Sequence, residues 1–197
     1  MPQRAADCRH MQHHLLLILM LLCTCCTGFR ESKPGVFGAP FIREEQMITR
    51  INEHQIRSVL CLRGGNSVRQ SKRATIAANA SFIQVPISAK SLPHPDALLS
   101  IWHVAAAAER PVMVHCRAGV DRTGLALALI ALHDTGSMSR ARVELAFTTN
   151  WHIKAFGTEA MDQVLDQFEP FCGIMSFPSW VDRVYRIDYE GKALTVR

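Results

Sequence analysis

The sequence predicts an α/β fold in which helices flank a central, mostly parallel sheet. Short apolar runs that end at glycine or proline residues alternate with longer segments whose apolar residues recur every three or four positions. Alternation of strands and helices is typical of parallel sheets, because each crossover helix covers a face of the sheet. At 197 residues, the chain has room for one domain with a sizeable core and a short extension.

The first half of the expected domain alternates helix and strand, beginning beyond Gly35. Isoleucine and methionine residues at helical spacing predict a helix over residues 42–53. The β-rich run at 57–62 predicts a strand, which a pair of glycines ends. A second helix over 70–78 leads to a second strand over 82–85, which a proline ends.

The second half contains the strongest amphipathic helix and the most apolar strand. An apolar stripe predicts a helix over 96–109, and the wholly apolar run 112–114 predicts a third strand. Residues 125–133 form a helix that is apolar on all sides, so we expect it to be buried. Three more helices are expected, over 139–150, 158–168 and 178–188.

Composition and charge exclude several classes of protein. Hydrophobic residues make up 48% and charged residues 20% of the chain, which is globular usage and excludes wholesale disorder. No run approaches about 18 consecutive apolar residues, so a polytopic membrane protein is excluded. The net charge is +5, and the lysines and arginines are scattered along the chain. This pattern suits an anionic substrate, and we expect no nucleic-acid partner.

Residues 1–30 differ from the rest of the chain. Two arginines, an apolar run at 15–22 and small residues after it form the pattern of an export signal. The clustered cysteines at 23–26 suggest a lipid anchor instead. We therefore expect an exported or membrane-associated protein, with membrane association through residues 11–28 and a catalytic domain over 31–197. The alternative is a cytoplasmic protein, in which this segment is a leader from an early start codon or a short packed helix.

The segment 112–124 carries the chemistry, and it runs from a strand through a loop into a helix. A tight turn of this kind points successive backbone N–H groups into one concavity, which suits an anion. Cys116 lies at the base of the turn, near the positive end of the helix dipole, where a thiol loses its proton readily. Arg122 returns to the concavity and can donate two N–H groups to phosphate oxygens. The segment therefore predicts a thiolate beneath a captured phosphate, ready for in-line attack.

The remaining loop residues complete this arrangement. Thr123 can donate a hydrogen bond to the thiolate, and His115 can orient the loop from behind. The glycines allow the loop to turn and the helix to pack closely. The expected substrate-binding residues are His115, Arg117, Ala118, Gly119, Val120 and Gly124. The chain's other cysteines outside the leader, Cys61 and Cys172, are too widely spaced for a disulfide framework or a zinc site, and we expect no metal.

Residues 115–124 resemble the signature of the cysteine-dependent protein tyrosine phosphatase superfamily, His-Cys-five residues-Arg-Ser/Thr-Gly, and match it at every position. The likeness is closest to the dual-specificity class, in particular its compact bacterial members. This resemblance implies the tyrosine/dual-specificity phosphatase fold and a phosphocysteine intermediate at Cys116 that water hydrolyses, with no cofactor. A looser likeness covers most of residues 35–190, at 58–63, at 85–88 and in the tail around Trp180 and Tyr185.

The resemblance also implies an aspartic acid that protonates the leaving group, and here the sequence departs from the pattern. In dual-specificity members this residue follows a strand that ends in a Val-Pro-like pair. The corresponding position is Ala89, which has no proton to donate. Asp121, one residue before Arg122, is our preferred substitute, although it is equally well explained as a brace for the loop. Asp96, at the start of a helix, is the alternative acid and is more simply a dipole-stabilising residue.

The function expected from these residues is hydrolysis of phosphate monoesters, namely phosphotyrosine and phosphoserine or phosphothreonine, in a phosphorylated protein or a small phosphorylated ligand. A phosphoinositide or inositol phosphate phosphatase is one alternative. Related enzymes favour two basic loop residues, of which Arg117 supplies one and Val120 leaves the other missing. A phosphate-binding pseudophosphatase is the other alternative. Arg63 and Lys90 are further candidates to face the substrate, although such residues are usually only solvated.

Cys61 has two interpretations. It ends a strand that should neighbour the strand before Cys116, so it could form a protective disulfide with an oxidised Cys116. A small buried core residue is the favoured interpretation, because free cysteines are among the most buried residue types.

Overall fold

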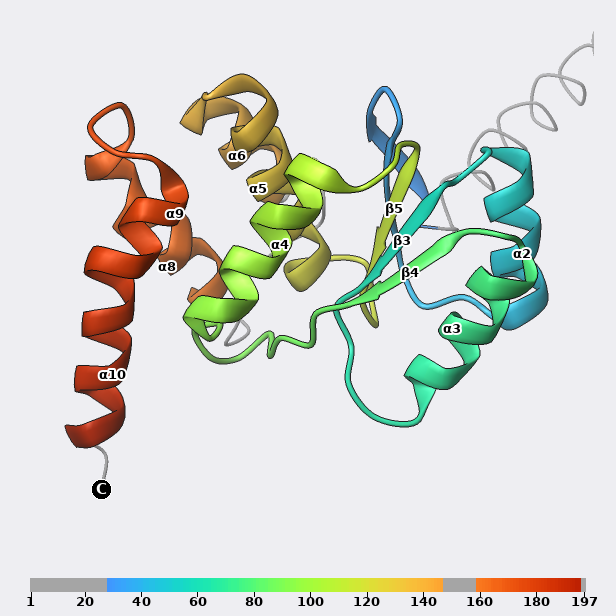
Figure 1. The fold of residues 1–197 in the computed structure, drawn as a ribbon, viewed down its shortest axis with the longest axis horizontal. Coiled ribbons are helices and arrows are strands. Elements are labelled where there is room, and N and C mark those ends of the chain that lie inside the picture. Colours follow the sequence, from blue (N-terminus) through green and yellow to red (C-terminus); the bar gives the residue numbers. More distant parts are fainter. Residues whose placement is uncertain (1–27, 147–158, 196–197) are drawn as a thin grey trace, which may run out of the picture.

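A five-stranded sheet in the order β1-β2-β5-β3-β4 forms the centre of the computed structural model, which describes residues 28–146 and 159–195 (Figure 1). The three contacts β2–β5, β5–β3 and β3–β4 are parallel, and only β1 pairs antiparallel, with β2. This architecture confirms the predicted α/β class with a mostly parallel sheet. The strands are β1 (Arg30–Lys33), β2 (Val36–Ala39), β3 (Ser58–Cys61), β4 (Ser81–Gln84) and β5 (Val112–His115).

The three predicted strands are confirmed, and no strand end differs from its predicted position by more than one residue. The hairpin of β1 and β2 was not predicted. Its turn lies at Gly35, whose φ of 73° belongs to the left-handed region that favours glycine. β1 consists of Arg-Glu-Ser-Lys, and no strand pattern is visible in four polar residues. β2 is wholly buried, since it lies between β1 and β5.

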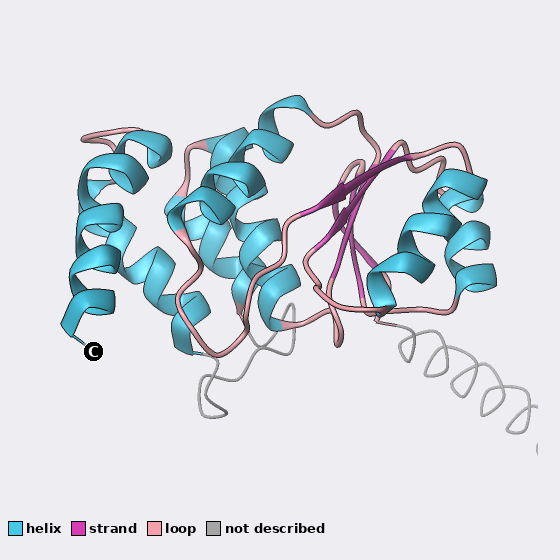
Figure 2. Cartoon of the chain, turned by 60° about the horizontal axis from the view of Figure 1, so that its bottom comes forward, coloured by secondary structure: helices cyan, strands magenta, loops and turns pink. Residues whose placement is uncertain are grey.

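Helices cover both faces of the sheet, as Figure 2 shows. One face carries α2 (Glu44–Glu53) and α3 (Ser67–Ala77), whose buried residues form a small core with Val59 and Met113. The other face carries α4 (Pro95–Ala107) and α5 (Asp121–Thr135). The outer layer on that side consists of α6 (Met138–Leu145), α8 (Glu159–Phe168), the 3₁₀ turn η3 (Glu169–Phe171), α9 (Phe177–Trp180), the π-helical turn η4 (Val181–Tyr185) and α10 (Arg186–Thr195).

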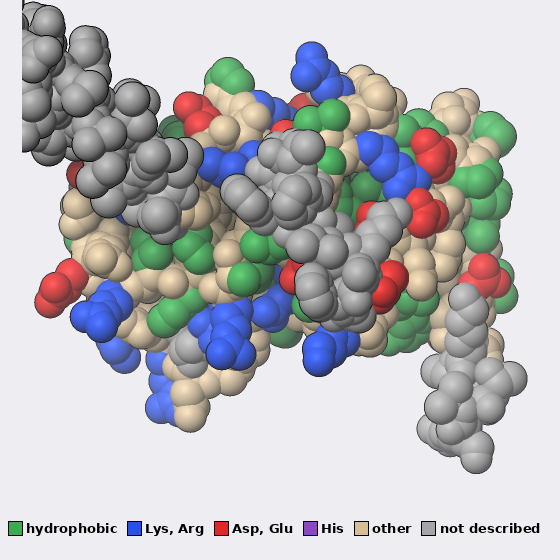
Figure 3. Space-filling model, turned by 180° about the vertical axis from the view of Figure 1, so that it is seen from behind, with side chains coloured by type: hydrophobic (Ala, Val, Ile, Leu, Met, Phe, Trp, Pro, Cys, Tyr) green, Lys and Arg blue, Asp and Glu red, His purple; other side chains and the backbone are tan. Residues whose placement is uncertain are grey.

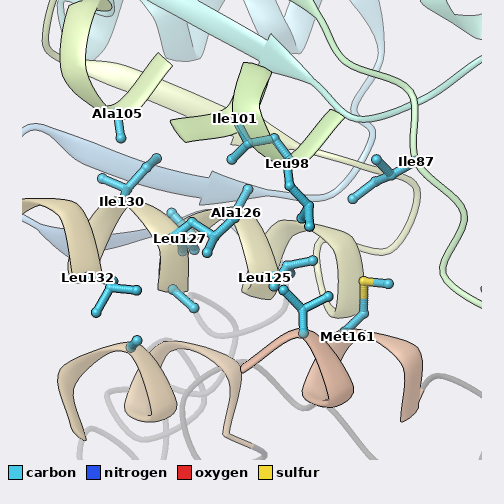
Figure 4. Packing of buried hydrophobic residues seen from close by; sticks show 14 of the residues in the cluster. Ile87, Leu98, Ile101, Ala105, Leu125, Ala126, Leu127, Ile130, Leu132 and Met161 are labelled. Carbon is cyan, nitrogen blue, oxygen red and sulfur yellow. The ribbon is translucent and has the colours of Figure 1, made fainter. Parts of the chain in front are cut away.

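The helix α5 is the centre of the larger core. Every residue from Thr123 to Leu132 is buried, which confirms the prediction of a helix that is apolar on all sides. Figure 4 shows α5 between α4, which contributes Leu98 and Ile101, and the outer helices, from which Met161 of α8 packs against it. Because replacing a buried leucine by alanine costs about 2–5 kcal/mol, this packing fixes α5 firmly. The loop that precedes α5 therefore rests on a rigid support.

Several helix boundaries differ from the predicted ones. The helix α5 begins at Asp121 rather than at residue 125, because the polar end of the motif already forms its first turn. The predicted helix over 178–188 belongs to a longer helical run from Phe177 to Thr195. The end of the helix predicted over 139–150 lies outside the described residues, and so does nearly all of the leader predicted at residues 1–30. Within the described ranges, no helix combines the length and the apolar character that a membrane crossing requires.

Candidate active site

The predicted anion-binding loop follows β5 at the carboxyl end of the sheet. Backbone hydrogen bonds hold it from both sides, because β5 lies between β2 and β3. The Phe41 N–H, which follows β2, donates to the Arg117 carbonyl at 3.0 Å. The Leu62 N–H, which follows β3, donates to the His115 carbonyl at 2.9 Å. The loop is therefore attached to the ends of both neighbouring strands.

Gly119 is required at its position by the backbone geometry. Its φ is 73°, and a Cβ atom there would lie 2.6 Å from the Pro40 nitrogen and 2.7 Å from the Ala39 carbonyl carbon. The absence of a side chain thus allows the loop to close onto the end of β2. In this conformation the Gly119 N–H donates to Cys116 Sγ at 3.3 Å. The sulfur therefore accepts a hydrogen bond from the backbone of its own loop.

Cys116 itself is almost fully buried, with 2% of its surface exposed, at the base of the loop that opens α5. Arg122 lies in the first turn of α5 and is half-buried. Its Nη1 donates to the carbonyls of Leu62 and Ile87, each at 3.3 Å. Among the described residues, no acceptor takes the hydrogens of Nε and Nη2. The guanidinium is thus anchored by one nitrogen, and its remaining N–H groups can bind two oxygens of an anion.

Thr123 and His115 are both fully buried, and neither side chain has a hydrogen-bond partner in the described part of the chain. The expected bond from the Thr123 hydroxyl to the Cys116 sulfur is therefore not formed. The Thr123 Cγ2 methyl instead packs against Gly38 of β2, where an added Cβ would lie only 3.3 Å away. Burial lowers the pKa of His115 from 6.5 to about 4, so its ring is neutral behind the loop.

Comparison with known proteins identifies the family. The family model described as "Tc-R-P: Polymorphic toxin system, DSP-PTPase phosphatase" matches residues 41–136, which include the loop and α5. Residues 41–136 belong to the cysteine-dependent protein tyrosine phosphatase superfamily. The resemblance to compact bacterial members of the dual-specificity class is confirmed. No protein of curated function matches the chain.

Solved structures of phosphatases share the fold. P. aeruginosa TpbA is 17% identical, with a TM-score of 0.57 over 72% of this chain and 84% of TpbA. The core catalytic domain of the PP-IP phosphatase SIW14 from S. cerevisiae is 16% identical, with a TM-score of 0.55 over 73% of this chain and 91% of that domain. Tk-PTP in its active form is 15% identical, with a TM-score of 0.55 over 71% of this chain and 97% of Tk-PTP. At these identities the likeness shows the fold alone.

The two candidate acids of this phosphatase lie in different environments. Asp121 is the first residue of α5, half-buried and adjacent to Arg122 in the loop. Asp96 is 67% exposed at the start of α4, and its Oδ1 lies 2.7 Å from Nη2 of Arg186 on α10. The hydrogen bond from Arg186 lowers the pKa of Asp96, which favours the carboxylate over the acid. Ala89 lies half-buried in the loop after β4.

Cys61 of the phosphatase is buried in the sheet, where its Cα pairs with that of His115. Burial raises the pKa of its thiol, so the neutral form is favoured. Side chains alternate along β3, and Val59 lies in the core under α2 and α3. Cys61 therefore faces that side, whereas Cys116 belongs to the core around α5. Cys116 also contributes to the raised pKa of Cys61, so the two thiols interact electrostatically, and the core and disulfide interpretations of Cys61 both stay predictions.

One contact at the site was missed in the sequence. The Arg63 guanidinium carbon lies 4.7 Å from the centre of the Phe41 ring. The sequence makes Arg63 a candidate to face the substrate, but Phe41 carries no local signal of a role. The contact depends on the sheet order, which places the ends of β2 and β3 on either side of β5. Among the described residues, no cluster of acidic, histidine or cysteine side chains could hold a metal ion.

Proposed function

We propose that this phosphatase hydrolyses phosphate monoesters through a phosphocysteine intermediate at Cys116. The observation that carries the proposal is the buried Cys116 sulfur, which accepts the Gly119 N–H in a loop beside the anchored Arg122. A nucleophile beneath a cradle of donors is suited to a phosphoryl group whose charge grows on its equatorial oxygens. Backbone N–H groups of residues 117–120 and the free edge of Arg122 would bind these oxygens.

The reaction then has two displacements at phosphorus. In the first, Cys116 Sγ attacks the phosphorus, the S–P bond forms, and the bond to the ester oxygen breaks. Asp121 gives its carboxyl proton to the departing oxygen. In the second, a water oxygen attacks the phosphorus and the S–P bond breaks, while the Asp121 carboxylate accepts the water proton. Inorganic phosphate leaves, and Cys116 and Asp121 return to their starting states.

Asp121 is the preferred acid on two grounds. It lies in the loop that binds the phosphate, so the departing oxygen is within its reach. Asp96 is hydrogen-bonded to Arg186, which lowers its pKa and disfavours the protonated form that an acid needs. The bracing role of Asp121 remains the alternative, and the leaving-group test in the Discussion separates the two.

The substrates we propose are phosphotyrosine and phosphoserine or phosphothreonine in proteins, or a small phosphorylated ligand. One solved structure of a TpbA variant contains pTyr, and SIW14 is named as a PP-IP phosphatase. An inositol phosphate or phosphoinositide is therefore the second candidate substrate, and the basic residues at the loop favour it. Export or membrane anchoring through residues 1–30 stays part of the proposal, supported by the apolar run at 15–22, with a cytoplasmic protein as the alternative.

Turnover of p-nitrophenyl phosphate by the full chain, beside its Cys116→Ser variant, tests the proposal. We expect turnover in the parent and a loss of at least about a thousandfold in the variant, since the nucleophile is removed. Rapid acid quench of the parent should trap phosphate on Cys116, detectable by mass spectrometry. Equal rates in both proteins would exclude the thiolate mechanism. Phosphate binding without turnover in the folded, reduced parent would establish the pseudophosphatase alternative.

A further inference from the structure

Arg63 and Phe41 contact each other across the end of the strand that leads to Cys116. Phe41 follows β2 and Arg63 follows β3, and these strands flank β5 on opposite sides. The guanidinium carbon of Arg63 lies 4.7 Å from the Phe41 ring centre, which is the geometry of a cation–π contact. The pair therefore spans the carboxyl end of β5, where the catalytic loop begins.

Backbone hydrogen bonds fix both members of this pair to the loop. The Phe41 N–H donates to the Arg117 carbonyl at 3.0 Å, and Leu62, directly before Arg63, donates to the His115 carbonyl at 2.9 Å. A third bond, from Gln84 Nε2 to the Arg63 carbonyl at 3.1 Å, ties the same turn to β4. The backbone on both sides of the pair is thus fixed beside the loop, and the Arg63 guanidinium lies over the Phe41 ring at this edge of the sheet.

The positive charge at this rim has no acidic partner among the residues that the structure describes. Six arginines elsewhere pair with carboxylates, namely Arg30, Arg50, Arg73, Arg110, Arg142 and Arg186, whereas others on the described surface, such as Arg140, do not. Within the described ranges, Arg63, Arg117 and Arg122 form no ion pair. Figure 3 shows Lys and Arg side chains gathered along the lower edge of the molecule, the edge at which the strands end in Figure 1. A single phosphate needs only Arg122 and the loop, so the rest of this charge is available to another anion.

We infer that Arg63, which lies over the Phe41 ring, forms a second anion subsite and that the substrate carries a further phosphate there. The inference rests on the proposed function, since the scissile phosphate occupies the loop. A guanidinium stacked on an aromatic ring keeps its edge N–H groups free for a phosphate, and the ring fixes their direction. The shared chemistry is a multiply phosphorylated polyol, either free or as the headgroup of a lipid.

The decisive quantity is a ratio, namely kcat/KM for myo-inositol hexakisphosphate divided by kcat/KM for p-nitrophenyl phosphate. We expect Arg63→Gln to lower this ratio about tenfold or more, mainly through KM, because a charge-assisted contact to the second phosphate is lost. Arg63→Lys keeps the charge but not the planar guanidinium, so its ratio should lie between those of the parent and of Arg63→Gln. The matched control is Arg140→Gln on α6, an exposed arginine that is also without an ion pair in the described chain, and it should leave both rates unchanged.

Two results would overturn the subsite. An unchanged ratio in Arg63→Gln would show that no second anion binds there, and an equal loss on both substrates would make Arg63 a support of the loop only. Comparing the soluble polyphosphate with phosphatidylinositol bisphosphate in phosphatidylcholine vesicles identifies which source is preferred. Calorimetric titration of the full chain and Arg63→Gln with inositol hexakisphosphate keeps the test independent of turnover. Weaker binding by the variant supports the subsite even if the parent hydrolyses neither compound, and equal binding excludes it.

Discussion

The backbone N–H of Gly119 points at the sulfur of Cys116 from 3.3 Å, and only a glycine can hold it there. The reason lies outside the loop, in the main chain at the end of β2. Ala39 and Pro40 occupy the space that a side chain at position 119 would need. The donor that faces the proposed nucleophile is thus set by the approach of two backbone segments that are distant in sequence.

Gly119→Ala should disable the site. The added Cβ would lie 2.6 Å from the Pro40 nitrogen, so the loop must move and carry its donors away from the phosphate. We expect at least a hundredfold lower kcat/KM on p-nitrophenyl phosphate and about 1–3 kcal/mol less stability in urea unfolding. Gly136→Ala is the matched control, since Gly136 has a φ of 65° but open space around it. That variant should lose about 1 kcal/mol of stability and keep its activity, and a similar loss of activity in both would contradict this explanation.

Asp121→Asn should slow the enzyme according to the leaving group. A poor leaving group such as the serine of a phosphoserine peptide needs the proton, so kcat should fall by about 10²–10⁴-fold. The nitrophenolate of p-nitrophenyl phosphate leaves without it, so its rate should change little. Asp96→Asn serves as the control, and a leaving-group effect in that variant instead would reverse the assignment.

The buried His115 should make the protein less stable in acid. Its pKa is about 4 in the folded chain and 6.5 in the unfolded chain, so between these pH values the unfolded chain binds a proton that the folded chain does not bind. Stability is therefore unaffected above pH 6.5 and falls between pH 6.5 and 4, by about 3 kcal/mol from this group. Urea unfolding at pH 7 and pH 4.5 should show a smaller fall for His115→Asn. The exposed His103→Gln should retain the full fall, and identical pH dependence in all three proteins would exclude His115 as the source.

Tyr185→Phe should loosen the C-terminal helices. The buried Tyr185 hydroxyl donates to the Pro93 carbonyl at 2.7 Å, which ties the π-helical turn to the residues before α4. Removing the hydroxyl should cost about 1–2 kcal/mol of stability, because the carbonyl is left without its partner. Tyr189→Phe removes a hydroxyl that makes no hydrogen bond in the described structure, so its melting temperature should match that of the parent. Equal melting temperatures for all three would contradict the role given to this bond.

The chemistry-bearing segment could be predicted because its signal is local. Cys116, Arg122 and the glycines between them form one strand–loop–helix unit, whose spacing alone indicates an anion site. The hairpin at β1 was missed because four polar residues at a sheet edge carry no alternation of apolar side chains. The contact of Arg63 with Phe41 was missed because it follows from the order of strands, which no local pattern encodes. The choice between Asp121 and Asp96 likewise needed the Arg186 partner, which comes from the far end of the chain.

The signature motif depends on helices that lie outside it, because these helices bury α5. The match to the family model ends at residue 136, just after α5, yet α6, α8 and η4 cover the outer side of the core around that helix. A fragment cut at that point would keep every residue from His115 to Gly124 and leave one side of an apolar helix in contact with water. Such a fragment would be drawn toward self-association rather than catalysis. The C-terminal helices contribute nothing to the signature, but they cover the apolar surface of α5 and so keep the segment that bears the signature out of contact with water.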